Sequence, residues 1–219
     1  MEMKNPIDQF WTLKLEAVKH NLEQNNFDVF VAPDAKTAKT IAMEEIIPAL
    51  DIKSVSWGGS MSFVETGLFH ELKDREDLEV LNTFDKSLSP EEMMDLRRQS
   101  LMVDLYITGT NAVTESGHLV NLDMVGNRVA AIMYGPKHVI LFVGRNKICN
   151  DLEDAMGRVK NFAAPVNIMR LEKKTPCLKT GVCHDCSSPD RICNYWTITE
   201  KCFQKKRIKV ILVNQDLGF

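Results

Sequence analysis

Residues 54–62 read SVSWGGSMS, and this stretch decides the fold because it passes from a strand-like run into a helix through two glycines. The helical side is marked by Ser62 and Glu65, which have the spacing of a capping box. A strand that leads directly into a helix is the beginning of a βα unit, and repeated βα units build a parallel sheet. Residues 54–62 therefore predict an α/β fold.

The same alternation continues on both sides of this stretch. Strand-like runs at 27–31 and 78–81 alternate with helical patterns, and a cap followed by an N1 proline opens a helix at Ser89-Pro90. Such alternation over the first half of the chain predicts a largely parallel sheet. The other predicted helices cover about 6–25, 34–47, 61–72 and 150–163.

After residue 103 the pattern changes to strand-like runs separated only by tight turns. These turns are rich in glycine, asparagine and proline. Strands joined so closely pair antiparallel, so we expect a mixed sheet with flanking helices. The predicted strands in this half are 104–114, 118–123, 128–134, 138–143, 166–169 and 208–213.

The composition is that of a folded domain with balanced charge. The chain has 219 residues, 44% of them hydrophobic and 26% charged, with a net charge of −3. A chain of this length buries about 70% of its unfolded surface, so it needs neither a disulfide nor a metal to fold. The charge gives no general attraction to nucleic acid or to an anionic membrane. We expect a single domain over residues 1–219.

The compartment is predicted from the N-terminus and from the apolar runs. The first 20 residues carry charges throughout and lack the apolar region of a signal peptide. No run approaches the roughly 18 apolar residues that span a bilayer. We expect a cytoplasmic protein without a membrane span or a nucleic-acid partner.

The glycine-rich turn is the first candidate binding site. Gly58 and Gly59 let the backbone approach a ligand, and Ser60 and Ser62 offer hydroxyl donors to a phosphate or carboxylate. The stretch has neither the Gly-Lys-Ser/Thr ending of a Walker A motif nor a GxGxxG fingerprint. A plain strand-to-helix turn, capped by one of the serines, is the competing interpretation.

The second candidate lies at the turns that follow residue 108. Glu115 could act as a base or nucleophile, or it could be a solvated residue of a hairpin whose turn is Ser116-Gly117. Arg128 could clamp an anion, or it could be a charge on an edge strand. The residue pattern leaves both alternatives open.

Four cysteines gather in one short segment, TPCLKTGVCHDCSSPDRICN at 175–194. Turn-forming residues separate the thiols, so one compact loop could place them around a single centre, and four sulfurs suit zinc or an iron–sulfur cluster. Reduced, metal-free thiols and disulfides formed in air are the alternatives. We therefore expect residues 175–203 to be a Cys-rich insertion, whose candidate ligands are Cys177, Cys183, Cys186 and Cys193.

Several short motifs, in this order and spacing, resemble the lactate-utilisation (LUD) domain family. They are WGGS at 57–60, ETGL at 65–68, TESG at 114–117 and GNRV at 126–129. The resemblance extends from the first helix to about residue 170 and returns at the closing strand. The cysteine segment is similar to that of a family branch carrying such an insertion.

The resemblance implies a fold akin to sugar-phosphate isomerases and coenzyme A transferases. In those relatives a glycine-rich loop and a carboxylate-bearing loop flank the substrate. It also implies a role near L-lactate oxidation, beside iron–sulfur oxidoreductase subunits. Carried over to this chain, the first loop is Gly58, Gly59 and Ser60, and the second holds Asn111, Glu115, Ser116 and Gly117.

Three functions follow as alternatives. The first is an auxiliary component of lactate oxidation that binds an anionic small molecule and a metal centre. The second is an isomerase or acyl/coenzyme A transferase that uses Glu115 beside the glycine-rich loop. The third is a metal-bearing module that docks a partner through the cysteine loop. An oligomer is compatible with each of them.

Overall fold

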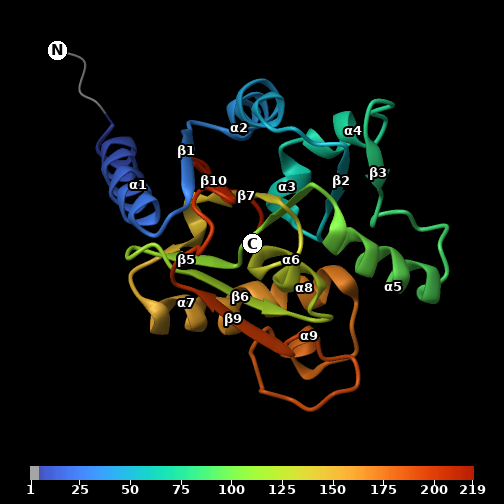
Figure 1. The fold of residues 1–219 in the computed structure, drawn as a ribbon. Helices are drawn as coiled ribbons and strands as arrows, with labels where there is room; N and C mark the ends of the chain where they lie inside the picture. The colour runs from blue at the N-terminus through green and yellow to red at the C-terminus, as the bar shows by residue number, and fades with distance from the viewer. Residues whose placement is uncertain (1–4) are drawn as a thin grey trace.

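A computed structural model describes residues 5–219 and shows two β-sheets surrounded by helices (Figure 1). The strands are β1 (Asp28–Ala32), β2 (Ser54–Trp57), β3 (Glu79–Leu81), β4 (Leu105–Gly109), β5 (Ala112–Thr114), β6 (Leu119–Asp123), β7 (His138–Gly144), β8 (Ile148–Cys149), β9 (Tyr195–Thr199) and β10 (Ile208–Val213). The larger sheet has the order β1-β10-β7-β4-β2-β3 and is parallel throughout. The smaller sheet has the order β8-β5-β6-β9 and contains both kinds of pairing.

Helices and the smaller sheet cover both faces of the larger sheet. The helices are α1 (Pro6–Gln24), α2 (Ala35–Thr40), α3 (Met61–Glu65), α4 (Leu68–Leu72), α5 (Pro90–Gln99), α6 (Asn127–Met133), α7 (Leu152–Arg158), α8 (Ala164–Leu171) and α9 (Pro176–Thr180). Helices α2, α3 and α4 pack on one face, and α1 packs on the other together with residues of β5 and β6. The central strands β7 and β10 are buried on both faces, and their residues are apolar apart from His138 and Lys209 near the strand starts.

The predicted α/β class is confirmed, and parallel and antiparallel pairs both occur. The antiparallel pairs lie in the smaller sheet, which is separate from the larger one because the predicted strand 104–114 breaks at Thr110 and Asn111 into β4 and β5. The last residues of β4 thus lie where the two sheets diverge. That point is where the candidate site is found.

Two predicted strands are wrong. Residues 128–133 belong to α6, Tyr134 is its C-cap, and residues 166–169 lie inside α8. The apolar run of α6 buries Val129, Ala131 and Ile132, a spacing that short runs of either period can produce. Gly126, with φ of +97°, precedes α6 in a left-handed conformation that glycine adopts without penalty.

The cysteine segment lies between α8 and β9, and it is drawn at the lower edge of the molecule in Figure 1. The predicted insertion 175–203 includes β9, which pairs antiparallel with β6. The segment is therefore tied to the smaller sheet through its own strand.

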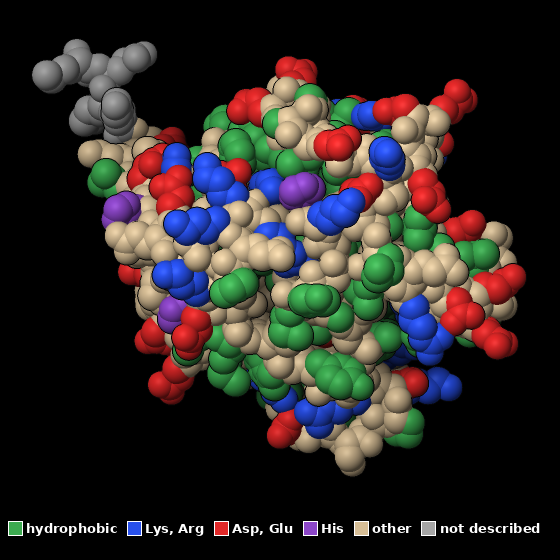
Figure 2. All heavy atoms as spheres, in the orientation of Figure 1, with side chains coloured by type: hydrophobic (Ala, Val, Ile, Leu, Met, Phe, Trp, Pro, Cys, Tyr) green, Lys and Arg blue, Asp and Glu red, His purple; other side chains and the backbone are tan. Residues whose placement is uncertain are grey.

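The surface carries both signs of charge. On the face drawn in Figure 2, acidic and basic side chains are interspersed, and hydrophobic side chains gather over its middle and lower part. Among the described residues, no helix has the combination of length and apolar character needed to cross a bilayer.

Candidate functional site

A pocket of about 350 Å³ lies at the carboxyl ends of the neighbouring strands β2 and β4, between the two sheets. Its walls come from the loop after β2, the residues after β4, the start of α6, and one side of α8. In open α/β sheets, ligands bind outside the carboxyl ends of the strands. The position and size of this pocket therefore suit a small metabolite.

The glycine-rich loop forms one wall, and Gly58, Gly59 and Ser60, the candidate anion ligands of that loop, line the pocket. A Cβ atom on Gly58 would lie 2.7 Å from the Tyr106 hydroxyl oxygen, so this position is restricted by a close approach. A Cβ atom on Gly59 would meet nothing within 4 Å. The Ser60 side chain accepts a hydrogen bond from the Phe63 N–H and so caps α3. The loop is thus fixed by the helix cap at Ser60, while the space beside Gly59 is free of protein atoms.

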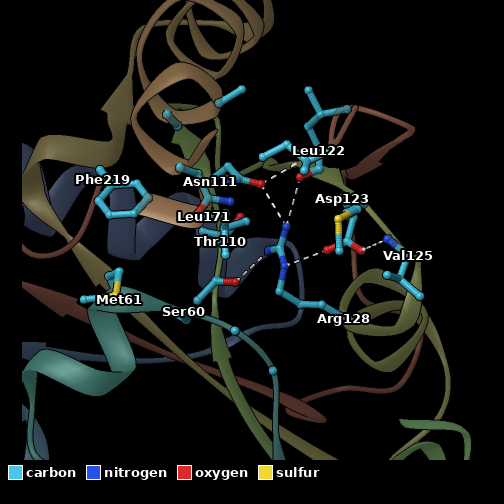
Figure 3. Close-up of a pocket in the computed structure, with 18 of the residues that line it drawn as sticks. Ser60, Met61, Thr110, Asn111, Leu122, Asp123, Val125, Arg128, Leu171 and Phe219 are labelled. Atoms are coloured by element: carbon cyan, nitrogen blue, oxygen red, sulfur yellow. Dashed lines mark hydrogen bonds and ion pairs between the residues drawn. The ribbon is translucent and has the colours of Figure 1, made fainter. Parts of the chain in front are cut away.

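Arg128 lies at the centre of the pocket wall, with dashed contacts to its neighbours in Figure 3. Its Nε donates to Asp123 at 2.9 Å, and its Nη2 donates to the Asn111 side-chain oxygen at 2.9 Å. Its remaining hydrogen bonds go to the Gly109 and Leu122 carbonyl oxygens and to the Asn121 side-chain oxygen. Arg128 and Asn111, both predicted as anion ligands, are brought together. The guanidinium N–H groups are therefore used in hydrogen bonds within the pocket wall.

Asp123 completes this network from the end of β6. One of its oxygens accepts from the Val125 and Gly126 N–H groups, and the other accepts from Arg128. Both side chains of the ion pair are about nine-tenths buried. A buried pair that also satisfies its other lone pairs is geometrically fixed. The network therefore joins the end of β4, the end of β6 and the start of α6 into one rigid corner.

The side chains that line the pocket carry more positive than negative charge. The basic side chains are Arg97, Arg128, Lys147 and Arg170, and the acidic side chain among the lining residues is Asp123. Burial lowers the pKa of Arg170. With Asp123 paired to Arg128, the charge that remains is positive, and it favours an anionic ligand.

Lys147 is a pocket residue that the sequence analysis missed. It follows β7 in a short 3-10 turn, Arg145–Lys147, which reads as an exposed polar turn in sequence. Its amine instead donates to Ser62 Oγ at 2.7 Å and to the Thr110 carbonyl oxygen at 3.2 Å. Ser62, predicted as an anion ligand, is fully buried and contacts the pocket through this lysine. No local pattern in the sequence signals that this lysine is turned inward.

Glu115, Ser116 and Gly117 lie elsewhere, at the turn between β5 and β6. The Glu115 carboxylate pairs with Lys14 of α1 at 2.6 Å, and its side chain is 49% exposed. The Ser116 and Gly117 carbonyl oxygens accept hydrogen bonds from Asn25. These residues do not line the pocket, so the structure does not place a Glu115 carboxylate beside the glycine-rich loop.

The four predicted cysteine ligands line one small recess of about 20 Å³. Arg191 holds the segment by donating to the Cys186 and Cys193 carbonyl oxygens. Burial raises the pKa of the Cys193 thiol. Ile192 and Cys193 line both this recess and the main pocket, so the two sites share a wall.

The donor set of the recess has the chemistry of a soft-metal site. Within residues 5–219, however, no three His, Cys, Asp or Glu side chains are arranged to hold a metal ion. The conformation described here thus brings the thiols to one place without ligating geometry.

Comparisons with known proteins agree with this architecture. The family model described as the LUD domain matches residues 15–213. No curated protein matches the sequence.

Two solved structures resemble the fold to different degrees. A DUF162 family protein from Deinococcus radiodurans is 16% identical, with a TM-score of 0.51, and the alignment covers 93% of this chain and 98% of that one. Ribose 5-phosphate isomerase from Plasmodium falciparum is 15% identical with a TM-score of 0.29, and the alignment covers 52% of this chain and 54% of that one. The first similarity supports the fold, and the second is too low to support a conclusion.

Proposed function

The chain belongs to the LUD domain family, and from that premise we propose that it is an auxiliary protein of lactate utilisation that binds a small anionic metabolite. The observation that carries this proposal is the charge of the pocket at the ends of β2 and β4. Four basic side chains and one acidic side chain line it, and the acidic one, Asp123, is already paired with Arg128. A carboxylate or another small oxyanion matches such a site.

The binding proposal predicts that the pocket binds negatively charged ligands in preference to neutral ones. Isothermal titration calorimetry at pH 6.5 should detect binding of L-lactate, pyruvate or sulfate, whereas lactamide, the neutral analogue of lactate, should not bind. Binding of lactamide as tightly as lactate, or of none of the anions, contradicts the proposal.

A variant of the glycine-rich loop locates the binding event. Gly59→Val places a side chain into the open space above the loop, so the fold should tolerate it while the pocket loses room. We expect anion affinity to fall at least tenfold, which corresponds to about 1.4 kcal/mol. Gly157→Val, in α7 and outside the pocket, is the matched control and should bind as the wild type does. Equal weakening in both variants, or in neither, argues against this pocket.

As a second function, we propose that the cysteine segment takes up zinc or an iron–sulfur cluster. The convergence of four thiols on one recess supports this proposal. Ligation requires the four cysteine thiols to rearrange and to lose their protons, because the thiolate is the form that binds a metal. Because the recess and the main pocket share Ile192 and Cys193, a metal bound in the recess would adjoin that pocket.

Metal analysis of protein purified without oxygen tests this second function. We expect about one equivalent of zinc, or iron and sulfide with visible absorbance. A variant with all four cysteines changed to serine should lack the metal but keep its far-ultraviolet circular dichroism, since the larger sheet forms its core without them. Metal-free wild-type protein after anaerobic purification contradicts the proposal.

We also propose iron–sulfur oxidoreductase subunits as the partners, following the family resemblance. Co-purification of such subunits with the tagged protein from a lactate-grown native host is the expected result. Their absence under crosslinking conditions argues against an assembly.

A further inference from the structure

Lys147 is a buried amine at the floor of the anion pocket. The residue is 4% exposed, although it lies in a short turn between β7 and β8. A lysine is almost never buried to this degree unless it is paired. The contacts and charges around Lys147 therefore decide how it is held in the interior.

The two hydrogen bonds of the Lys147 amine fix the orientation of the side chain, but both acceptors are uncharged. Ser62 Oγ donates its own proton to the Leu217 carbonyl oxygen at 3.0 Å, so it offers a lone pair to Lys147 Nζ. The second acceptor is the Thr110 carbonyl oxygen. A protonated lysine has three N–H donors, and two are used here. The third remains for a ligand in the pocket that the residue lines.

The charges around Lys147 leave it without a counter-ion. Arg158 of α7 and Arg128 of α6 repel its positive charge, and Glu65 of α3 attracts it. Glu65 is engaged elsewhere, where its carboxylate accepts from the Gly218 N–H. Among residues 5–219, no ion pair includes Lys147.

This environment disfavours the charged amine. Burial, followed by repulsion from Arg158 and Arg128, lowers the pKa of Lys147 to about 7. Both protonation states are therefore populated near neutral pH. An anion placed beside the amine favours its charged form and raises the pKa again.

We propose that Lys147 recognises a negative oxygen of the bound metabolite, and that the anion and a proton bind together. The proposal rests on the proposed function, because it names the recognition group of the same pocket. Arg128 does not offer a free donor to the anion, because its N–H groups already donate to protein acceptors. A carboxylate and a tetrahedral oxyanion share the required chemistry, which is one charged oxygen that accepts the third N–H.

Calorimetric titration in buffers of different ionisation enthalpy measures the proton. L-Lactate and sulfate are the probes, because neither titrates between pH 6 and pH 9 and together they separate carboxylate from tetrahedral oxyanion. At pH 8 we expect uptake of most of one proton per anion, and at pH 6 much less, because the free amine is then already protonated. Affinity should fall about tenfold per pH unit well above the pKa of the free amine.

Two substitutions assign the effect to Lys147. Lys147→Met removes the charge at similar side-chain length and should weaken anion binding at least tenfold at pH 6.5. Lys147→Arg keeps a permanent charge, so any binding that it retains should lack proton uptake. Lys86→Met, at an exposed lysine outside the pocket, is the control and should behave as the wild type does. Circular dichroism and thermal unfolding confirm that each variant is folded.

The outcomes separate the two claims. If no anion binds the wild-type protein, the proposed function fails, and this inference fails with it. If anions bind the wild type and Lys147→Met equally, without proton uptake, the binding function stands and the assignment to Lys147 is overturned.

Discussion

At the scale of single residues, two basic side chains of the pocket have different roles. Arg128 is saturated by protein acceptors and holds the wall together, whereas Lys147 keeps one donor toward the pocket. An arginine suits the first role because its planar fork satisfies several acceptors at fixed angles. A lysine suits the second because its pKa shifts when it is buried.

The wall-forming role of Arg128 predicts a large loss of stability when it is removed. Arg128→Met leaves the Asp123 carboxylate buried without its charged partner, and breaking such a pair costs about 3–5 kcal/mol. Urea unfolding followed by circular dichroism measures the change. The control is Arg98→Met, which breaks the exposed pair with Asp95 and should cost less than about 1 kcal/mol.

Similar small losses in both variants contradict the wall-forming role. If Arg128→Met does not fold, Arg128→Lys provides the second measurement. That variant keeps the charge but loses the forked geometry, so it should lie between the wild type and Arg128→Met.

At the scale of elements, Asp104 joins the starts of two neighbouring strands. Its carboxylate accepts from the Lys53 and Ser54 N–H groups at the start of β2, and it pairs with Lys137 at 2.7 Å. The bond with Lys137, followed by that of the Lys53 N–H, lowers the pKa of Asp104 from 3.8 to about 2. The deprotonated form is therefore the one that stabilises this junction.

The sign of the resulting pH dependence follows from the lowered pKa. The stabilisation is fully present above the unfolded-state pKa of about 4 and is lost as the pH falls through about 2. Urea unfolding of the wild type between pH 5 and pH 2 should therefore show a steeper loss of stability than Asp104→Asn. Parallel pH profiles of the two proteins argue against a stabilising role for the Asp104 charge.

Local sequence patterns predicted most of the elements, and the exceptions have physical reasons. The strands at 27–31, 53–57, 78–81 and 208–213 are found where their apolar runs indicated. The run at 128–134 is a helix because its burial follows helical spacing, which a seven-residue apolar segment does not reveal. The tight turns predicted antiparallel neighbours correctly for β5 and β6 but not for β7, which pairs in parallel with β4.

The candidate site was predicted in part. The glycine-rich loop, Asn111 and Arg128 do line one pocket, because a loop after a parallel strand lies at the carboxyl edge of the sheet. Lys147 could not be predicted, since its burial depends on how the turn after β7 packs against α3 and the end of β4. Glu115 lies apart because its hairpin is directed toward α1.

At the scale of the whole molecule, the pocket lies where the two sheets meet. The larger sheet supplies the glycine-rich loop and the end of β4, and the smaller sheet supplies the end of β6 and the network around Arg128. The cysteine recess adjoins this pocket through Ile192 and Cys193. The two-sheet fold thus places the candidate anion pocket beside a thiol-lined recess.

The central claim is that a small anion binds between the glycine-rich loop and Lys147. The most direct measurement is a titration of the isotope-labelled protein with L-lactate at pH 6.5, followed by amide nuclear magnetic resonance. The account predicts saturable shifts centred on the amides of Gly59, Ser60, Asn111 and Lys147. Shifts that avoid these amides, or that do not saturate, contradict it.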